Sequence, residues 1–71
     1  MNIIVKNYRT QEPIVSGNGI EVINYLDKKI RQNEANGANL QHLDAAMMVF
    51  DTINSHVAVD YPEIGVSLQR S

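Results

Sequence analysis

The residues best suited to chemistry in this chain are its two histidines, which supply ring nitrogens for metal binding or proton transfer. His42 and His56 are expected on one helix, where a rise of about 1.5 Å per residue separates them by roughly 21 Å. Asp44 and Asp51 are also too far apart on that helix to share an ion. The spacing within one chain therefore predicts no metal site.

Nucleophilic side chains are equally poorly placed for catalysis. The chain has no cysteine, which excludes disulfides and thiolate zinc sites. Ser55 precedes His56 directly, but neighbouring side chains on a helix point about 100° apart and do not form a dyad. The stretch "SGNG" at 16–19 lacks the length and the lysine of a P-loop, so we interpret it as a turn and helix cap. The sequence predicts no enzyme, no catalytic residue and no cofactor.

One cluster of basic residues, Lys28, Lys29 and Arg31, is a candidate phosphate patch. Its position in the second half of the first expected helix also suits compensation of the helix dipole. The second expected helix has no lysine or arginine and carries two aspartates, which repel phosphate. Binding to nucleic acid is therefore expected to be weak or undetectable.

Composition is that of a small ordinary domain. A chain of 71 residues with a net charge of −2 and 20% charged residues is neither polybasic nor typical of a disordered tail. Its apolar runs are too short for a signal peptide or a membrane span, so we expect a cytoplasmic protein with no membrane partner. Chains this short usually gain stability from disulfides, a metal or association, and this sequence favours association.

Elements in the first half of the chain are signalled by residue type and spacing. β-Branched and aromatic residues predict a strand over 3–9, and Pro13 limits Ile14–Val15 to a short edge strand. Asn18 and Glu21 have nearly the spacing of a capping box for a helix over Gly19–Glu34. The apolar stripe of this helix comprises Val22, Ile23, Leu26 and Ile30, with Ile20 at its edge, and Gly37 is expected to end it.

A second helix is predicted from Leu40, capped by Asn39, to about His56. Its expected core stripe comprises Leu40, Leu43, Ala46, Met47, Phe50, Ile53 and Val57. Residues 57–61 fit either a continued helix or a strand, and residues 64–69 alternate as a half-buried strand does. The first and last strands are expected to pair beneath an antiparallel helix hairpin. This predicts one α+β domain over 1–71, built in two layers.

The second helix contains six consecutive apolar residues, Ala45 to Phe50, which cannot all lie on one face. With Ala46, Met47 and Phe50 assigned to the core, the opposite face is the predicted interface: Ala45, Met48 and Val49, in line with His42 and His56. A helix that is apolar all round is usually buried on two sides. The alternative is that these are ordinary surface residues or are covered by the terminal strands.

These observations together predict a small non-enzymatic protein–protein interaction module. We expect it to form a homodimer or higher oligomer, or to dock on a larger protein as an accessory or inhibitory protein of the kind found in phages and mobile elements. Two alternatives remain open. One is a nucleic-acid-associated regulator that uses the basic cluster at 28–31, and the other is a small-molecule sponge with a pocket between subunits.

Overall fold

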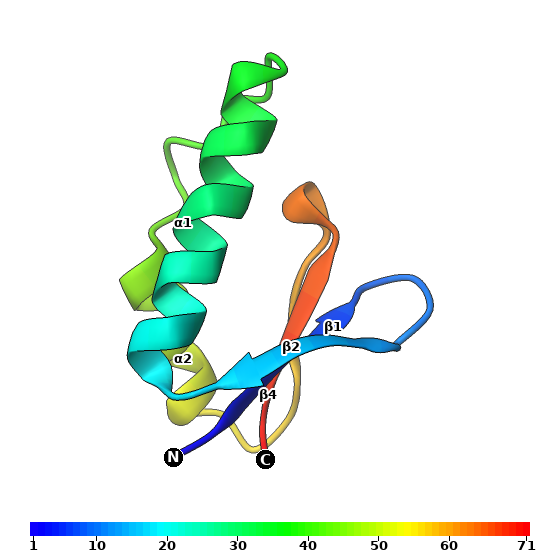
Figure 1. Cartoon of the computed structure of the whole chain (residues 1–71), viewed down its shortest axis with the longest axis vertical. Helices are drawn as coiled ribbons and strands as arrows, with labels where there is room; N and C mark the ends of the chain where they lie inside the picture. Colours follow the sequence, from blue (N-terminus) through cyan, green and yellow to red (C-terminus); the bar gives the residue numbers. More distant parts are fainter.

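Two helices pack on one face of a four-stranded antiparallel sheet in the computed structural model, which describes residues 1–71 (Figure 1). The elements along the chain are β1 (Ile3–Asn7), β2 (Pro13–Gly17), α1 (Gly19–Ala35), α2 (Ala45–Ile53), β3 (Val59–Tyr61), the 3₁₀ turn η1 (Pro62–Ile64) and β4 (Val66–Arg70). The predicted α+β fold of two layers is confirmed. Neither helix combines the length and apolar composition needed to cross a membrane.

The sheet has the strand order β2-β1-β4-β3. The first and last strands, β1 and β4, are central neighbours and pair antiparallel with Val5 opposite Leu68, which confirms their predicted pairing. The β2 strand lies at one edge, as Pro13 predicts, because proline has no N–H to donate to a further strand. Its register shifts after Val15, the partner of Val5, so that Pro13 lies opposite Lys6.

The core lies between the sheet and the helices. Alternate residues of β1 and β4 point toward the helices, and one stripe of α1 covers them. This core is made of aliphatic side chains, methionine and alanine, and contains no aromatic residue: Ile3, Val5, Val22, Leu26, Ile30, Leu40, Ala45, Met48, Val49, Ile64, Val66 and Leu68.

The α1 helix begins at the predicted residue with the predicted cap, and it ends at Ala35, one residue later than predicted. Asn18 Oδ1 accepts a hydrogen bond from the N–H of Glu21 (2.9 Å), and Glu21 Oε1 accepts one from the N–H of Asn18 (3.2 Å). This reciprocal pair satisfies two donors that the first turn leaves free. Gly37 follows the last turn with φ of 96°, a left-handed conformation that glycine adopts without steric cost.

The α2 helix is much shorter than predicted, beginning at Ala45 rather than Leu40. The chain before it forms a tight turn in which the N–H of Leu43 bonds to the carbonyl of Leu40. Asp44 then adopts an extended conformation (φ −132°) and its side chain accepts from the N–H of Met47. Asp44 therefore caps the helix, and the prediction that Asn39 does so is wrong.

The predicted faces of α2 are reversed in the structure. Met48 and Val49 are buried, whereas Met47 and Phe50 are 55% and 59% exposed. The predicted core face is wrong because its position on the helix depends on counting from Leu40 and Leu43. Both residues precede the first residue of α2. A helical period cannot be extended through a stretch that is not helical.

The segment after α2 leaves the helix before His56. Asn54 ends α2, and Val57, a predicted core residue, is 74% exposed in the connecting loop. Of the ambiguous residues 57–61, 59–61 form β3. Gly65, with φ of 71°, then turns the chain from η1 into β4, which begins two residues later than its alternating pattern predicted.

Candidate functional site

Both helices carry exposed apolar side chains. We call one group of them the apolar strip and define it as Ala46, Met47 and Phe50 of α2 with Ile20 of α1. Met47 and Phe50 are three positions apart and therefore neighbours on one helix face. Phe50 is the only phenylalanine of the chain.

The first turn of α1 lies beside the middle of α2. A Cβ atom added to Gly19 would lie 3.7 Å from Cγ1 of Val49, so the two backbones approach closely there. Ile20, the next residue along α1, is 72% exposed. The two helices run in opposite directions (Figure 1), and the start of α1 lies beside α2 at Val49.

A groove of about 390 Å³ opens between the two helices beside the apolar strip. Its lining is apolar at Ile23, Ile30, Leu43, Ala45 and Ala46, and charged at Asp27, Arg31, Glu34 and Asp44. Ala46 belongs to both the groove and the apolar strip, so the two features are continuous.

The surroundings of the apolar strip are acidic. Three carboxylates and one guanidinium line the groove, and α2 itself carries no basic residue. Asp51, exposed on α2, extends this charge toward β3, where its carboxylate is close enough to affect Tyr61. Burial raises the pKa of Tyr61 above its ordinary value, and the negative charges of Asp51 and Glu63 raise it further.

The predicted interface residues Ala45, Met48 and Val49 belong to the core of the monomer and are at most 4% exposed. Met48 and Val49 are therefore not available to a partner, and this part of the prediction is wrong, whereas the small exposed fraction of Ala45 lies in the wall of the groove. The observation behind the prediction, that α2 is apolar on two sides, agrees with the structure. The exposed side carries Met47 and Phe50, and the buried side carries Met48 and Val49.

The two histidines lie outside α2, at opposite ends of it. Nε2 of His42 lies 3.1 Å from Oε2 of Glu63, which ties the connection between the helices to η1. This hydrogen bond is the main reason why the pKa of Glu63 is lowered from its ordinary value. His56 instead lies in the loop after α2, where it lines a second pocket with Arg70. No three His, Asp or Glu side chains are grouped closely enough to hold a metal ion.

The three residues of the candidate phosphate patch all lie on α1. Arg31 lines the acidic groove, whereas Lys28 and Lys29 do not. Sequence reasoning missed the groove and the proximity of His56 to Arg70, because both depend on which elements become neighbours in space. The sequence pattern predicts Phe50 on the core face of the second helix, whereas the structure places its side chain on the exposed face.

Comparison with protein-family models, with curated proteins and with solved structures found no match to this chain.

Proposed function

We propose that the protein is a small non-enzymatic protein–protein interaction module whose docking surface is the apolar strip and the adjoining groove. The placement of Phe50 carries this proposal: the largest apolar side chain of α2 is outside, while the core contains no aromatic residue. Covering the exposed apolar surface of such a side chain favours binding, because that surface is removed from water. Aromatic and methionine side chains are also enriched at the centres of protein interfaces.

The charges around the apolar strip favour one kind of partner, a segment with apolar anchors flanked by lysine or arginine. Asp27, Glu34 and Asp44 at the groove and Asp51 beyond it would attract such flanks. A second copy of this chain is less suitable, because pairing α2 with α2 brings Asp44 and Asp51 of both copies into one interface without a base on either helix. An accessory or inhibitory protein would act by occupying the partner's segment.

The direct test is a titration of the isotope-labelled protein with a synthetic amphipathic peptide. One peptide carries a leucine and phenylalanine stripe flanked by lysines, and a matched peptide carries glutamates in place of the lysines. We expect the lysine peptide to shift the NMR signals of Met47, Phe50 and the groove residues, and the glutamate peptide to leave them unchanged. Phe50→Asp should weaken binding of the lysine peptide at least tenfold, even though it adds a negative charge.

Ile14→Asp is the matched control, because Ile14 is 46% exposed on β2 and lies outside the apolar strip. This variant should bind the lysine peptide as the unmodified protein does. The proposal is overturned if neither peptide shifts these signals, or if Phe50→Asp and Ile14→Asp bind equally. If light scattering shows a dimer that Phe50→Asp dissociates, the occupant is a second copy and the proposed basic partner is wrong.

A further inference from the structure

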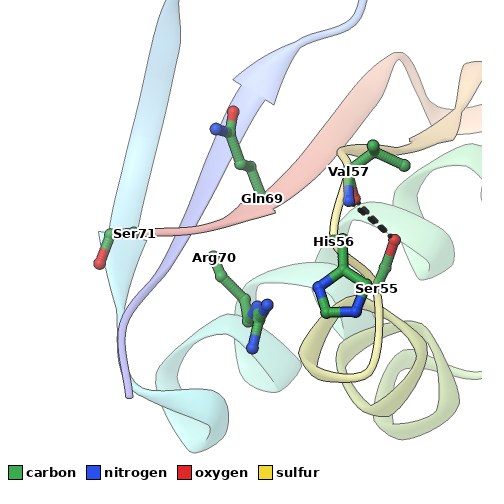
Figure 2. Close-up of a pocket in the computed structure, with 6 residues that line it drawn as sticks. All are labelled: Ser55, His56, Val57, Gln69, Arg70 and Ser71. Atoms are coloured by element: carbon green, nitrogen blue, oxygen red, sulfur yellow. Dashed lines mark hydrogen bonds between the residues drawn. The ribbon is translucent and has the colours of Figure 1, made fainter.

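The pocket near the end of β4 is separate from the apolar strip and has a different character. It has a volume of about 250 Å³ and is lined by Ser55, His56, Val57, Gln69, Arg70 and Ser71. Figure 2 shows the side chain of Arg70 extending from β4 toward the imidazole of His56, which comes from the loop after α2.

This pocket exists because β3 stops short of the end of β4. The last paired residues are Val59 and Leu68, so a continued ladder would next join Val57 to Arg70. Instead, the Ser55 hydroxyl donates to the carbonyl of Val57 (2.8 Å) and accepts from its N–H (3.2 Å). Ser55 thus satisfies both backbone groups of Val57 locally, and the loop turns away from the sheet.

As a result, Arg70 has unused donors on this side. In an antiparallel strand, alternate residues direct their N–H groups to the same neighbour, and Ser71 donates to Asn2 on the β1 side. The N–H of Arg70 therefore points the other way, toward the pocket, where no acceptor bonds to it. Arg70 is half-buried as a residue, and its guanidinium has no ion pair within the chain.

The chemistry of the lining is that of an anion site. Arg70 supplies a planar fork of donors, His56 supplies a ring nitrogen, and no acidic side chain lines the pocket. Gln69 also lines the pocket, but Figure 2 shows its side chain directed away from Arg70 and His56, and its amide oxygen accepts from Nζ of Lys6 (2.8 Å). A tetrahedral oxyanion can accept from several such donors at once, and arginine suits it by geometry as well as by charge.

We infer that this pocket binds a phosphate group, with the guanidinium and N–H of Arg70 as its main donors and His56 as an additional one. The site is independent of the docking surface on the helices and takes a small ligand rather than a protein segment. It uses none of the residues of the cluster at 28–31.

The test is an NMR titration with inorganic phosphate at constant pH, in which sodium chloride keeps the ionic strength equal at every point. We expect saturable shifts of the Arg70 and His56 signals. Arg70→Gln should weaken binding at least fivefold, and His56→Gln should weaken it by a smaller factor. Arg9→Gln is the matched control, since Arg9 lies exposed in the turn after β1 and outside the pocket, and it should bind as the unmodified protein does.

A thermal melt of each variant establishes that the fold is retained. If Arg70→Gln unfolds, the affinity of His56→Gln for phosphate still tests the inference, because this variant changes only a side chain in a loop. The inference is overturned if phosphate gives only the shifts that sodium chloride gives, or if Arg9→Gln weakens binding as much as Arg70→Gln. Acetate provides a further arm: equal affinity for acetate would show a general carboxylate site and reject phosphate as the ligand class.

Discussion

Met48 and Phe50 show how strongly surroundings differ between residues only two positions apart. Met48 is 2% exposed and packs in the core, while Phe50 is 59% exposed on the other side of the same helix. A core side chain contributes through burial and close packing, so its loss leaves a cavity. An exposed side chain has neither role in the monomer, whatever its hydrophobicity.

Alanine substitution should therefore separate the two residues. Met48→Ala is expected to lower the free energy of unfolding by about 2–5 kcal/mol. Phe50→Ala is expected to change it by no more than about 0.5 kcal/mol, as is usual for surface sites. Urea unfolding followed by circular dichroism measures both. Equal losses at the two positions would show that the assignment of the faces is wrong.

The contact between His42 and Glu63 should make stability depend on pH. The pKa of Glu63 is lowered in the folded chain, first by the hydrogen bond from His42. A carboxyl group whose pKa is lower when folded stabilises the fold above its unfolded pKa, and this contribution is lost as pH falls through the folded pKa. At neutral pH we expect His42→Ala to be less stable than the unmodified protein.

Both side chains are substantially exposed, 59% and 41%, so solvent screening should keep this difference below about 1 kcal/mol. The difference should shrink as the solution is acidified through the range in which Glu63 gains its proton. Urea unfolding of both proteins across an acidic pH series tests this. A difference that stays constant or widens on acidification would contradict it.

At the scale of elements, α2 depends on a single cap. It has nine residues, and short helices are marginal without tertiary packing and a satisfied first turn. Asp44 bonds to the N–H of Met47 through its side chain, so Asp44→Ala should cost about 1 kcal/mol of unfolding free energy. Asp44→Asn, which keeps an oxygen acceptor, should recover most of this loss. Asn39→Ala is the control and should have little effect, because Asn39 lies outside the helix.

The two helices also explain which elements could be predicted from sequence. The α1 helix has a capping box at its start and a glycine after its end, and between them its apolar stripe has one consistent phase. In α2 the strongest apolar residues upstream, Leu40 and Leu43, belong to a turn that also faces the core. A helical-wheel projection cannot distinguish a residue in a helix from a buried residue in a turn. Beginning the predicted helix at Leu40 instead of Ala45 therefore exchanged its buried and exposed faces.

Prediction of the candidate sites failed for a related reason. The acidic groove brings Asp27 of α1 and Asp44, the cap of α2, into one lining, and the pocket at the end of β4 brings His56 beside Arg70. Neither pair has a spacing that marks it in the sequence. The prediction that α2 carries apolar residues on two sides depends only on the residue types within the helix, and the structure agrees with it.

At the scale of the whole molecule, the strand order of the sheet makes folding depend on both the first and the last strand. The central pair joins β1 to β4, so both ends of the chain are needed to cover the core. Removing residues 66–71 should therefore abolish the cooperative thermal transition, because it exposes Ile3 and Val5 and leaves β1 without its central partner. Circular dichroism melts measure this. A shortened chain that still melts cooperatively would contradict it.

The pairing of β1 with β4 has a consequence for synthesis of the protein. A ribosome makes β1 before β4, so the β1–β2 hairpin and its contacts with α1 can form before the central ladder does. Closing the central ladder joins positions far apart in sequence, and such long-range pairing is slow compared with local structure formation. The core between the sheet and the helices therefore stays incomplete until β4 is made, and an incomplete core leaves apolar surface exposed to aggregation.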